Sequence, residues 1–531
     1  MNALVGTRAL VRLALRRDRI MLPAWLLVFV GMAASSAAAT KDLYPTVDSR
    51  VNAALAANST PALVALYGKV YDTTSLGGIG VLKLGGIGSA MVAVLTIFIV
   101  VRHTRAEEET GRLELLGATV LGRYAPLTAA FIVALATNVA LGVVTGLGLT
   151  AAGLPADGSF AFGFAWAGVG IAFAAITAVI AQLTTGARAA IGLSSATLGV
   201  VYAIRAIGDT SSVDGPRWLT WLSPIGWGQQ FRPYAGNRWW VLLITVGFAL
   251  VLGAVAYVLV ARRDMGAGLL ADRPGRPEAS RWLRSPLALA WRLHRTALIG
   301  WGAGFAFGGL VLGSIANSVG KFLDTPQAKD MIIKLGGESA LSDAFLATEF
   351  SFLGVFVSAY GIATANRLRA EETELRAEPV LAGAVSRTRW VLSHLSVALV
   401  GTAVLLAVAG LTAGLAHASQ TGDPDQIGRV LGSAMVQVPG AWVLTGIVVL
   451  VFGYAPRLVV LGWVALVTFL LLGELGPMLK LDQKIMDVSP YAHVPKMPGG
   501  DLTWTPLVWL TGIAAVLIVA GTYGFRRRDA T

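Results

Sequence analysis

Long apolar segments alternate with short charged segments along almost the whole chain. An α-helix needs about 20 predominantly apolar residues to cross the hydrocarbon core of a bilayer. Twelve segments in the 531-residue sequence meet this requirement. They lie at about 20–39, 84–101, 126–150, 160–183, 189–207, 239–261, 297–318, 348–365, 390–416, 433–454, 457–478 and 505–525. The pattern predicts an all-α polytopic membrane protein.

The composition agrees with this interpretation and excludes several classes of functional site. Only 14% of the residues are charged, whereas soluble domains carry about a quarter. The sequence has no cysteine, which excludes disulfides, thiolate metal sites and cysteine nucleophiles. Its five histidines are scattered and never at metal-ligand spacing. We therefore predict no catalytic residues and no metal site, and we assign the net charge of +12 to cytoplasmic loops rather than to nucleic-acid binding.

A charged segment at residues 102–123 follows the second apolar segment, and it recurs 264 positions later at residues 366–389. Alternating charges on a short cytoplasmic helix offer a surface that a soluble partner binds through ion pairs, and two copies suit a two-fold partner. The alternative is an ordinary solvated loop. The matching residues are Arg105, Ala106, Glu107, Glu108, Arg112, Glu114, Ala118 and Arg123, repeated as Arg369, Ala370, Glu371, Glu372, Arg376, Glu378, Ala382 and Arg387.

Shorter matches extend this duplication along the chain. The matched pairs are Ser223-Pro224 with Ser489-Pro490 and Arg263-Asp264 with Arg528-Asp529. We predict two tandem six-span halves, residues 1–264 and 286–531, joined by a cytoplasmic connector at 265–285. Halves with an even number of spans are parallel repeats, so their pseudo-two-fold axis runs along the membrane normal.

The distribution of positive charge predicts the orientation. With the N-terminus in the cytoplasm, 27 of the 42 Lys and Arg residues fall in cytoplasmic segments, as the positive-inside rule requires. This topology places both termini and both charged segments in the cytoplasm, in a multi-pass protein of the plasma membrane.

Arginines also precede the first span of each half. Arg8, Arg12, Arg16 and Arg19 are spaced to share one helical face, which predicts an amphipathic helix on the membrane surface. The alternative is a charged region ahead of an ordinary first span. A cleaved signal peptide is disfavoured because the segment is repeated in the second half, where the equivalent arginines are Arg292 and Arg295.

Charged residues within predicted spans are energetically costly and are functional candidates by default, and two of them stand out. Arg205 is near the outer end of the fifth span, and Glu474 is near the outer end of its counterpart, the eleventh. We expect them either to pair at an outer gate or to reach the outer headgroups separately. Single polar residues within spans, such as Asn138, are best explained by hydrogen bonds between helices.

The charged segment after the second span of a six-span unit resembles the membrane subunits of ATP-binding-cassette exporters, and in particular the fused twelve-span actinobacterial polyketide-antibiotic and multidrug efflux permeases. The resemblance implies that the charged segments are coupling helices that contact two copies of an ATPase subunit, which bind ATP and Mg²⁺. It also implies that the arginine-rich starts of both halves contact the ATPase. The implied coupling residues are Glu107, Glu108, Arg112, Glu114, Glu371, Glu372, Arg376 and Glu378. Leu375 and Pro379 replace Gly111 and Leu115, so the two contacts are expected to be unequal.

The sequence contains no Gly-x-x-x-x-Gly-Lys-Ser/Thr motif. If ATP drives transport, this chain does not bind it by that route, and a separate subunit carries the motor. The expected function is export of hydrophobic or amphiphilic drugs or antibiotics by alternating access. One alternative is a secondary drug/proton antiporter, which is disfavoured because no carboxylate lies in the middle of a predicted span. Another is a polytopic membrane transferase, which would need a clear acidic or histidine cluster on a loop.

Overall fold

Long helices form from the apolar segments, as their composition predicts. The computed structural model describes residues 3–117, 120–211, 215–264, 266–270, 278–316, 338–478 and 482–528. These residues form helices, turns and loops and contain no β-strand, so the predicted all-α class is confirmed. The chain divides into two compact units, residues 1–275 and 276–531, which we describe separately.

The first unit contains thirteen α-helices and one 3₁₀-helix among its described residues. They are α1 (Thr7–Arg17), α2 (Met21–Leu43), α3 (Val47–Ser59), α4 (Pro61–Tyr67), α5 (Leu76–Gly80), α6 (Leu82–Arg102), α7 (Arg105–Glu109), α8 (Arg112–Gly117), α9 (Ala125–Ala151), α10 (Ala156–Leu183), α11 (Ala187–Thr210), η1 (Arg217–Leu222), α12 (Pro224–Gln230) and α13 (Val241–Arg262).

The second unit is built in a similar way in its described part. Its helices are α14 (Pro286–Ala316), α16 (Glu338–Thr373), α17 (Ala377–Leu381), α18 (Arg387–Thr421), α19 (Asp425–Met435), α20 (Val438–Tyr454), η3 (Pro456–Leu458), α21 (Leu461–Met478), α22 (Gln483–Met486), η4 (Pro490–His493) and α23 (Trp504–Arg527).

Eleven helices of the described part are long and apolar enough to span a membrane. The predicted eleventh span, at 457–478, corresponds to the shorter apolar stretch Leu461–Gly473 of α21. The chain ahead of it is taken up by the 3₁₀-turn η3, which begins at Pro456. The predicted span 433–454 is interrupted between α19 and α20, just before Pro439, which cannot donate a helical hydrogen bond.

Close helix packing explains much of the glycine content. In the first unit α10 is largely buried and packs against α6, α9 and α13. The backbones of α9 and α10 meet at Gly142 and Gly163, where a Cβ on Gly163 would lie 2.1 Å from the Gly142 carbonyl oxygen. In the second unit α20 and α23 meet in the same way at Gly453 and Gly521. Small residues therefore allow these helices to approach within backbone contact.

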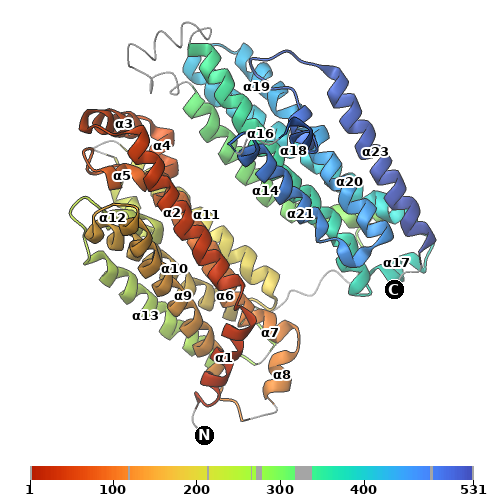
Figure 1. Cartoon of the computed structure of the whole chain (residues 1–531). Coiled ribbons are helices and arrows are strands. Elements are labelled where there is room, and N and C mark those ends of the chain that lie inside the picture. Colours follow the sequence, from red (N-terminus) through yellow and green to blue (C-terminus); the bar gives the residue numbers. More distant parts are fainter. Residues whose placement is uncertain are drawn as a thin grey trace. The chain divides into compact units, whose positions relative to one another are not determined.

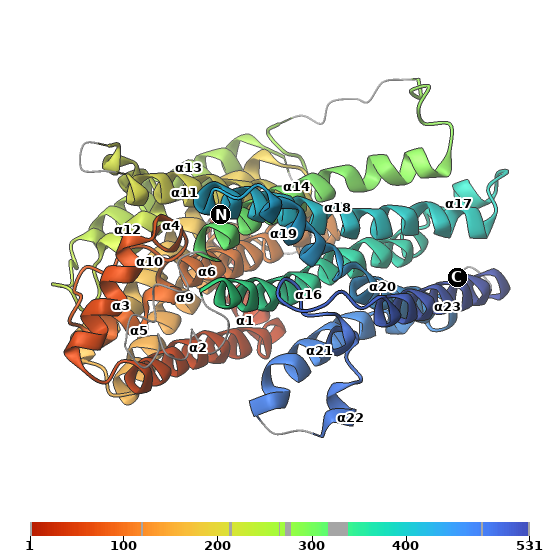
Figure 2. The same cartoon turned by 90° about the horizontal axis from the view of Figure 1, so that it is seen from above.

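The short helices of the first unit gather at two opposite ends of its long helices. Figure 1 shows α3, α4, α5 and α12 at one end and α1, α7 and α8 at the other. Within the second unit, α17 lies at the same end of the long helices as the end of α23, and α19 lies at the opposite end (Figures 1 and 2). Each charged segment therefore lies at the end of its unit where the last long helix finishes.

Candidate functional site

The repeated charged segment forms a broken helix in each unit. In the first unit α6 ends at Arg102, and α7 and α8 follow with Gly111 between them. In the second unit α16 continues without a break to Thr373, and α17 follows. We call these charged segments 1 and 2, residues 102–123 and 366–389.

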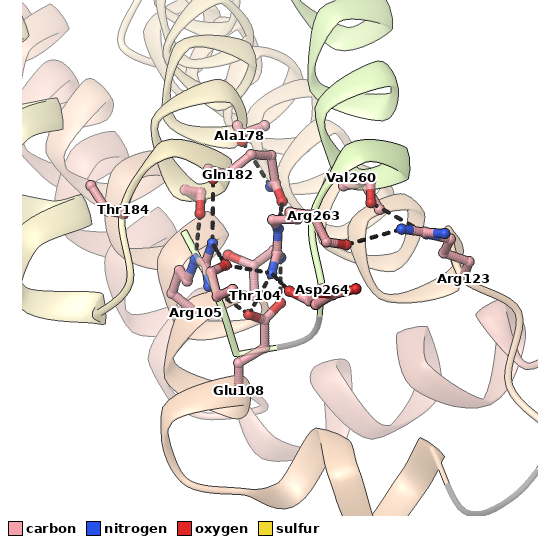
Figure 3. Close-up of polar contacts among 12 residues, drawn as sticks. Thr104, Arg105, Glu108, Arg123, Ala178, Gln182, Thr184, Val260, Arg263 and Asp264 are labelled. Carbon is pink, nitrogen blue, oxygen red and sulfur yellow. Dashed lines mark hydrogen bonds and ion pairs between the residues drawn. The ribbon is translucent and has the colours of Figure 1, made fainter. Parts of the chain in front are cut away.

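Charged segment 1 is fastened to the end of α13 by a buried ion-pair cluster (Figure 3). Arg105 Nη1 lies 2.7 Å from Glu108 Oε2, and Arg263 Nη1 donates to the same oxygen at 3.0 Å. Arg263 also donates to Glu108 Oε1 and, at 2.7 Å, to the side-chain oxygen of Gln182 on α10. Arg105 is fully buried, and only 8% of the Arg263 and Glu108 side chains is exposed. The carboxylate of Glu108 is therefore satisfied within the chain.

The second unit contains the same arrangement at the corresponding residues. Arg369 Nη1 lies 3.2 Å from Glu372 Oε2. Arg528, just beyond the end of α23, donates from Nη2 to both carboxylate oxygens of Glu372 at 2.8 and 2.9 Å. The matching arginines, Arg263 and Arg528, belong to the Arg-Asp pairs that repeat in the sequence. Their role as partners of the acidic pairs could not be derived from the sequence.

The first glutamate of each acidic pair is also engaged within the chain. Glu107 forms ion pairs with Arg17 at the end of α1 and with Arg112. Glu371 forms ion pairs with Arg367 at 3.1 Å and with Arg376 at 3.2 Å. All four predicted coupling glutamates of the acidic pairs are therefore engaged within the chain. Glu108 and Glu372 bind the arginine that follows the last helix. Glu107 binds α1 as well as its own segment, and Glu371 binds arginines of its own segment.

The arginine that closes each charged segment caps the last long helix of its unit. Arg123 donates to the carbonyl oxygens of Arg263 at 2.9 Å and Val260 at 3.3 Å (Figure 3). Arg387 donates to the carbonyl oxygen of Arg526 at 3.4 Å and to that of Arg528. The last carbonyls of a helix lack intrahelical partners, and a cation there also interacts favourably with the helix dipole. This explains why an arginine closes both copies.

The remaining predicted coupling residues are exposed. Two leucines in the same segments are also exposed, Leu115 in charged segment 1 and Leu375 in charged segment 2. The exposed members of the predicted set are Arg112, Glu114, Arg376 and Glu378. These residues form the surface that a partner can contact, and the docking itself remains a prediction.

The arginine-rich starts of the two halves are helical but differ in their continuity. The first forms α1, which ends before Arg19 and is separated from α2 by a turn. The second runs directly into the long helix α14. The six arginines predicted to contact the ATPase have exposed side chains and are Arg8, Arg12, Arg16, Arg19, Arg292 and Arg295.

A buried acidic residue that we did not single out from the sequence joins α1 and α2 to α6. Asp18 is fully buried, 2.9 Å from Arg102 Nε and 2.7 Å from His103 Nε2. Its only sequence signal is that it is a lone acid among the N-terminal arginines.

The structure gives Arg205 a partner in its own helix. Arg205 is fully buried, 3.4 Å from Asp209 one turn further along α11, and Tyr202 packs on its guanidinium group. The side chain of Glu474 lies outside the described residues, so the predicted Arg205–Glu474 pair remains a prediction. Asn138 on α9 donates to Thr96 on α6 at 3.1 Å, which agrees with a hydrogen bond between helices.

A cavity of about 360 Å³ lies beside charged segment 1 and is lined by residues of α7, α8, α9, α10 and α13 and of the loops next to them. Both carboxylates and arginines reach it, together with apolar residues such as Leu127 and Val260. No group of three histidine or acidic side chains among the described residues could hold a metal ion. The lining side chains of Glu108, Gln182 and Arg263 form charge-assisted contacts between segments of the chain.

Comparisons with known proteins match both halves of the chain. The family model described as "Multidrug efflux system permease Rv1217c, C-terminal domain" matches residues 8–260 and 283–526. The chain is 45% identical to the multidrug efflux system permease protein Rv1217c of Mycobacterium tuberculosis (strain ATCC 25618 / H37Rv), over 99% of this chain and 96% of that protein. Each stretch matched by the family model contains one of the two charged segments.

Proposed function

We propose, from the premise that this chain belongs to the family of multidrug efflux system permeases, that it is the membrane-spanning subunit of an ATP-driven exporter. The candidate spans, eleven of them among the described residues, provide the passage through the membrane. The chain itself acts as a transport subunit rather than as an enzyme.

The motor is a separate polypeptide in this proposal, because the sequence has no phosphate-binding Gly-x-x-x-x-Gly-Lys-Ser/Thr motif. The observation that carries the proposal is the pair of charged segments, each at the end of a unit with charged and apolar side chains exposed. Two such surfaces suit two copies of an ATPase subunit, which would bind ATP and Mg²⁺. The termini and both charged segments are cytoplasmic.

The proposed substrates are hydrophobic or amphiphilic drugs or antibiotics, in keeping with the name of the M. tuberculosis relative. Transport follows alternating access. ATP binding closes the ATPase dimer, the charged segments move with it, and the population of outward-facing permease rises because ATP binds that state more tightly. No covalent chemistry takes place in this chain.

Purification of the tagged chain from its own host in mild detergent tests the proposal. We expect an ATPase subunit to copurify at two copies per chain. The most informative variant combines Glu114→Arg with Glu378→Arg, which reverse exposed charges that lie outside the ion pairs described above. Reversal of the paired glutamates, or of Arg112 and Arg376, would also break ion pairs within the chain. The double variant should lose the ATPase.

The matched control is Asp48→Arg, an exposed reversal on α3 at the opposite end of the first unit, which should retain the ATPase. A purified chain that transports drugs on a proton gradient without any ATPase would contradict the proposal and support the antiporter.

A further inference from the structure

We propose that Arg263 and Arg528 are the positioning residues that make the last long helix of each half move together with the ATPase-contacting segment. This inference rests on the proposed function and adds the route by which movement leaves the charged segments. Arg263 and Arg528 follow immediately after the last residues of α13 and α23. Each reaches back across more than 150 residues of sequence to one glutamate of the acidic pair.

The ion pairs between these arginines and glutamates are rigid. Arg263 contacts both carboxylate oxygens of Glu108, and Arg528 contacts both of Glu372. Such charge-assisted contacts to both oxygens fix geometry better than a single contact does. The four side chains are between 5% and 15% exposed, so water does not screen them as it does surface pairs.

Each charged segment is attached to the last long helix of its half at two points. The glutamate near its start binds the arginine after the helix, and the arginine at its end, Arg123 or Arg387, caps the final carbonyls of that helix. Two separated attachments prevent the segment from pivoting about either one. A displacement of the segment therefore displaces the end of α13 or α23.

In the first half, charged segment 1 and the arginine after α13 are also attached to a second long helix, α10. Arg105 donates to the carbonyl oxygen of Ala181, and Arg263 Nε donates to Gln182 Oε1, at the end of α10 (Figure 3). Helix α10 is the largely buried helix of this unit. Movement of charged segment 1 is thereby passed to the packed centre of the half.

The test measures drug transported per ATP hydrolysed by the permease–ATPase complex in liposomes. We expect Arg263→Gln and Arg528→Gln each to lower this ratio about tenfold, within the usual range of coupling between sites, while the ATPase still copurifies. The matched controls are Arg262→Gln and Arg526→Gln, exposed arginines close by in sequence, which should leave the ratio unchanged.

A conservative variant separates coupling from general damage to the fold. Arg263→Lys keeps a cation beside Glu108, so it should recover part of the ratio that Arg263→Gln loses. If Arg263→Lys is as harmful as Arg263→Gln, or if Arg262→Gln is as harmful, the inference is wrong. If no ATPase copurifies with the parent chain, the proposed function fails instead.

The absence of cysteine permits a direct measurement of joint movement. Spin labels at Thr110→Cys and Leu250→Cys, exposed side chains of charged segment 1 and α13 that lie outside the predicted docking residues, report the distance from charged segment 1 to the last helix. We expect one narrow distance in nucleotide-free and ATP-bound complexes, and a broader distribution in Arg263→Gln. A distance that changes with ATP in the parent complex would overturn the inference.

Discussion

Gly111 and Leu375 occupy the same position in the two charged segments, and both have a backbone φ in the left-handed region, +70° and +58°. Glycine adopts this conformation without strain, whereas a residue with a Cβ does so at a cost of about 1–2 kcal/mol. The turn is therefore the same in both halves and strained only in the second. The two charged segments therefore differ in sequence at a point where their backbones agree.

Leu375→Gly is expected to stabilise the protein slightly, by about 0.5 kcal/mol. Relief of the strain exceeds the entropy that glycine adds to the unfolded chain, and Leu375 is 61% exposed, so little burial is lost. The midpoint of thermal unfolding in detergent, followed by tryptophan fluorescence, checks this. Gly111→Ala should shift the midpoint in the opposite direction, and shifts of the same sign would contradict the explanation.

Asp18→Asn is expected to destabilise the first unit by about 2 kcal/mol. The substitution removes the negative charge of a fully buried carboxylate that contacts Arg102 and the buried His103, and breaking such a pair is costly. This loss of stability is smaller than is usual for breaking a buried ion pair, because the Arg102 side chain is 38% exposed and can turn toward water. Chemical denaturation in detergent measures the change. Asp42→Asn, at an exposed acid beyond the buried part of α2, should have almost no effect, and equal effects would show that the Asp18 contacts contribute nothing.

Gly521→Ala should lower the free energy of unfolding by about 2 kcal/mol. The added Cβ would lie 2.4 Å from the Val449 carbonyl oxygen and so disturb the packing of α23 against α20. The same helix supplies the control. A Cβ at Gly512 meets nothing within 4 Å, so Gly512→Ala should be neutral or stabilising through better helix propensity. The yield of monodisperse protein and its unfolding midpoint distinguish the two variants, and equal behaviour would refute the role of backbone contact.

Unfolding should become easier at strongly alkaline pH. Burial raises the pKa of Tyr71 to about 12 and that of Tyr234 to about 12, whereas an unfolded tyrosine has a pKa of about 10. The folded state therefore holds these phenol protons more tightly. This contribution to stability is fully present below pH of about 10 and is lost as pH rises through about 12.

The unfolding midpoint measured between pH 8 and 12 checks this expectation. Tyr71→Phe combined with Tyr234→Phe should flatten the decline, whereas Tyr454→Phe, at a tyrosine that is 61% exposed, should leave it unchanged. An identical decline in the double variant would rule out these two phenols as its source.

Charge exchanges can distinguish the Arg205–Asp209 contact from the predicted Arg205–Glu474 pair at an outer gate. If Asp209 is the partner that matters, Arg205→Asp combined with Asp209→Arg should recover more transport than Arg205→Asp alone. Arg205→Glu combined with Glu474→Arg should then recover none. The reverse pattern would establish the Arg205–Glu474 pair. Transport assays in the complex with its ATPase decide between them.

Several features could be predicted because they depend on local sequence. Ranges such as 126–150 and 505–525 closely match α9 and α23, since apolar length alone produces a membrane helix. Boundaries were less predictable where charged residues continue a helix, as in α16, which runs through the acidic pair to Thr373. Hydropathy cannot detect a helix that continues out of the apolar layer.

The recurrence of charges in register at 102–123 and 366–389 can be seen in the sequence alone, because a repeat needs no coordinates. Which of those charges are available to a partner depends on the tertiary structure. Glu108 and Glu372 are occupied by Arg263 and Arg528, more than 150 residues away in sequence. Such pairing depends on where the last helix of each half ends in space. Burial and long-range ion pairs arise from helix packing, and spacing along the chain does not encode them.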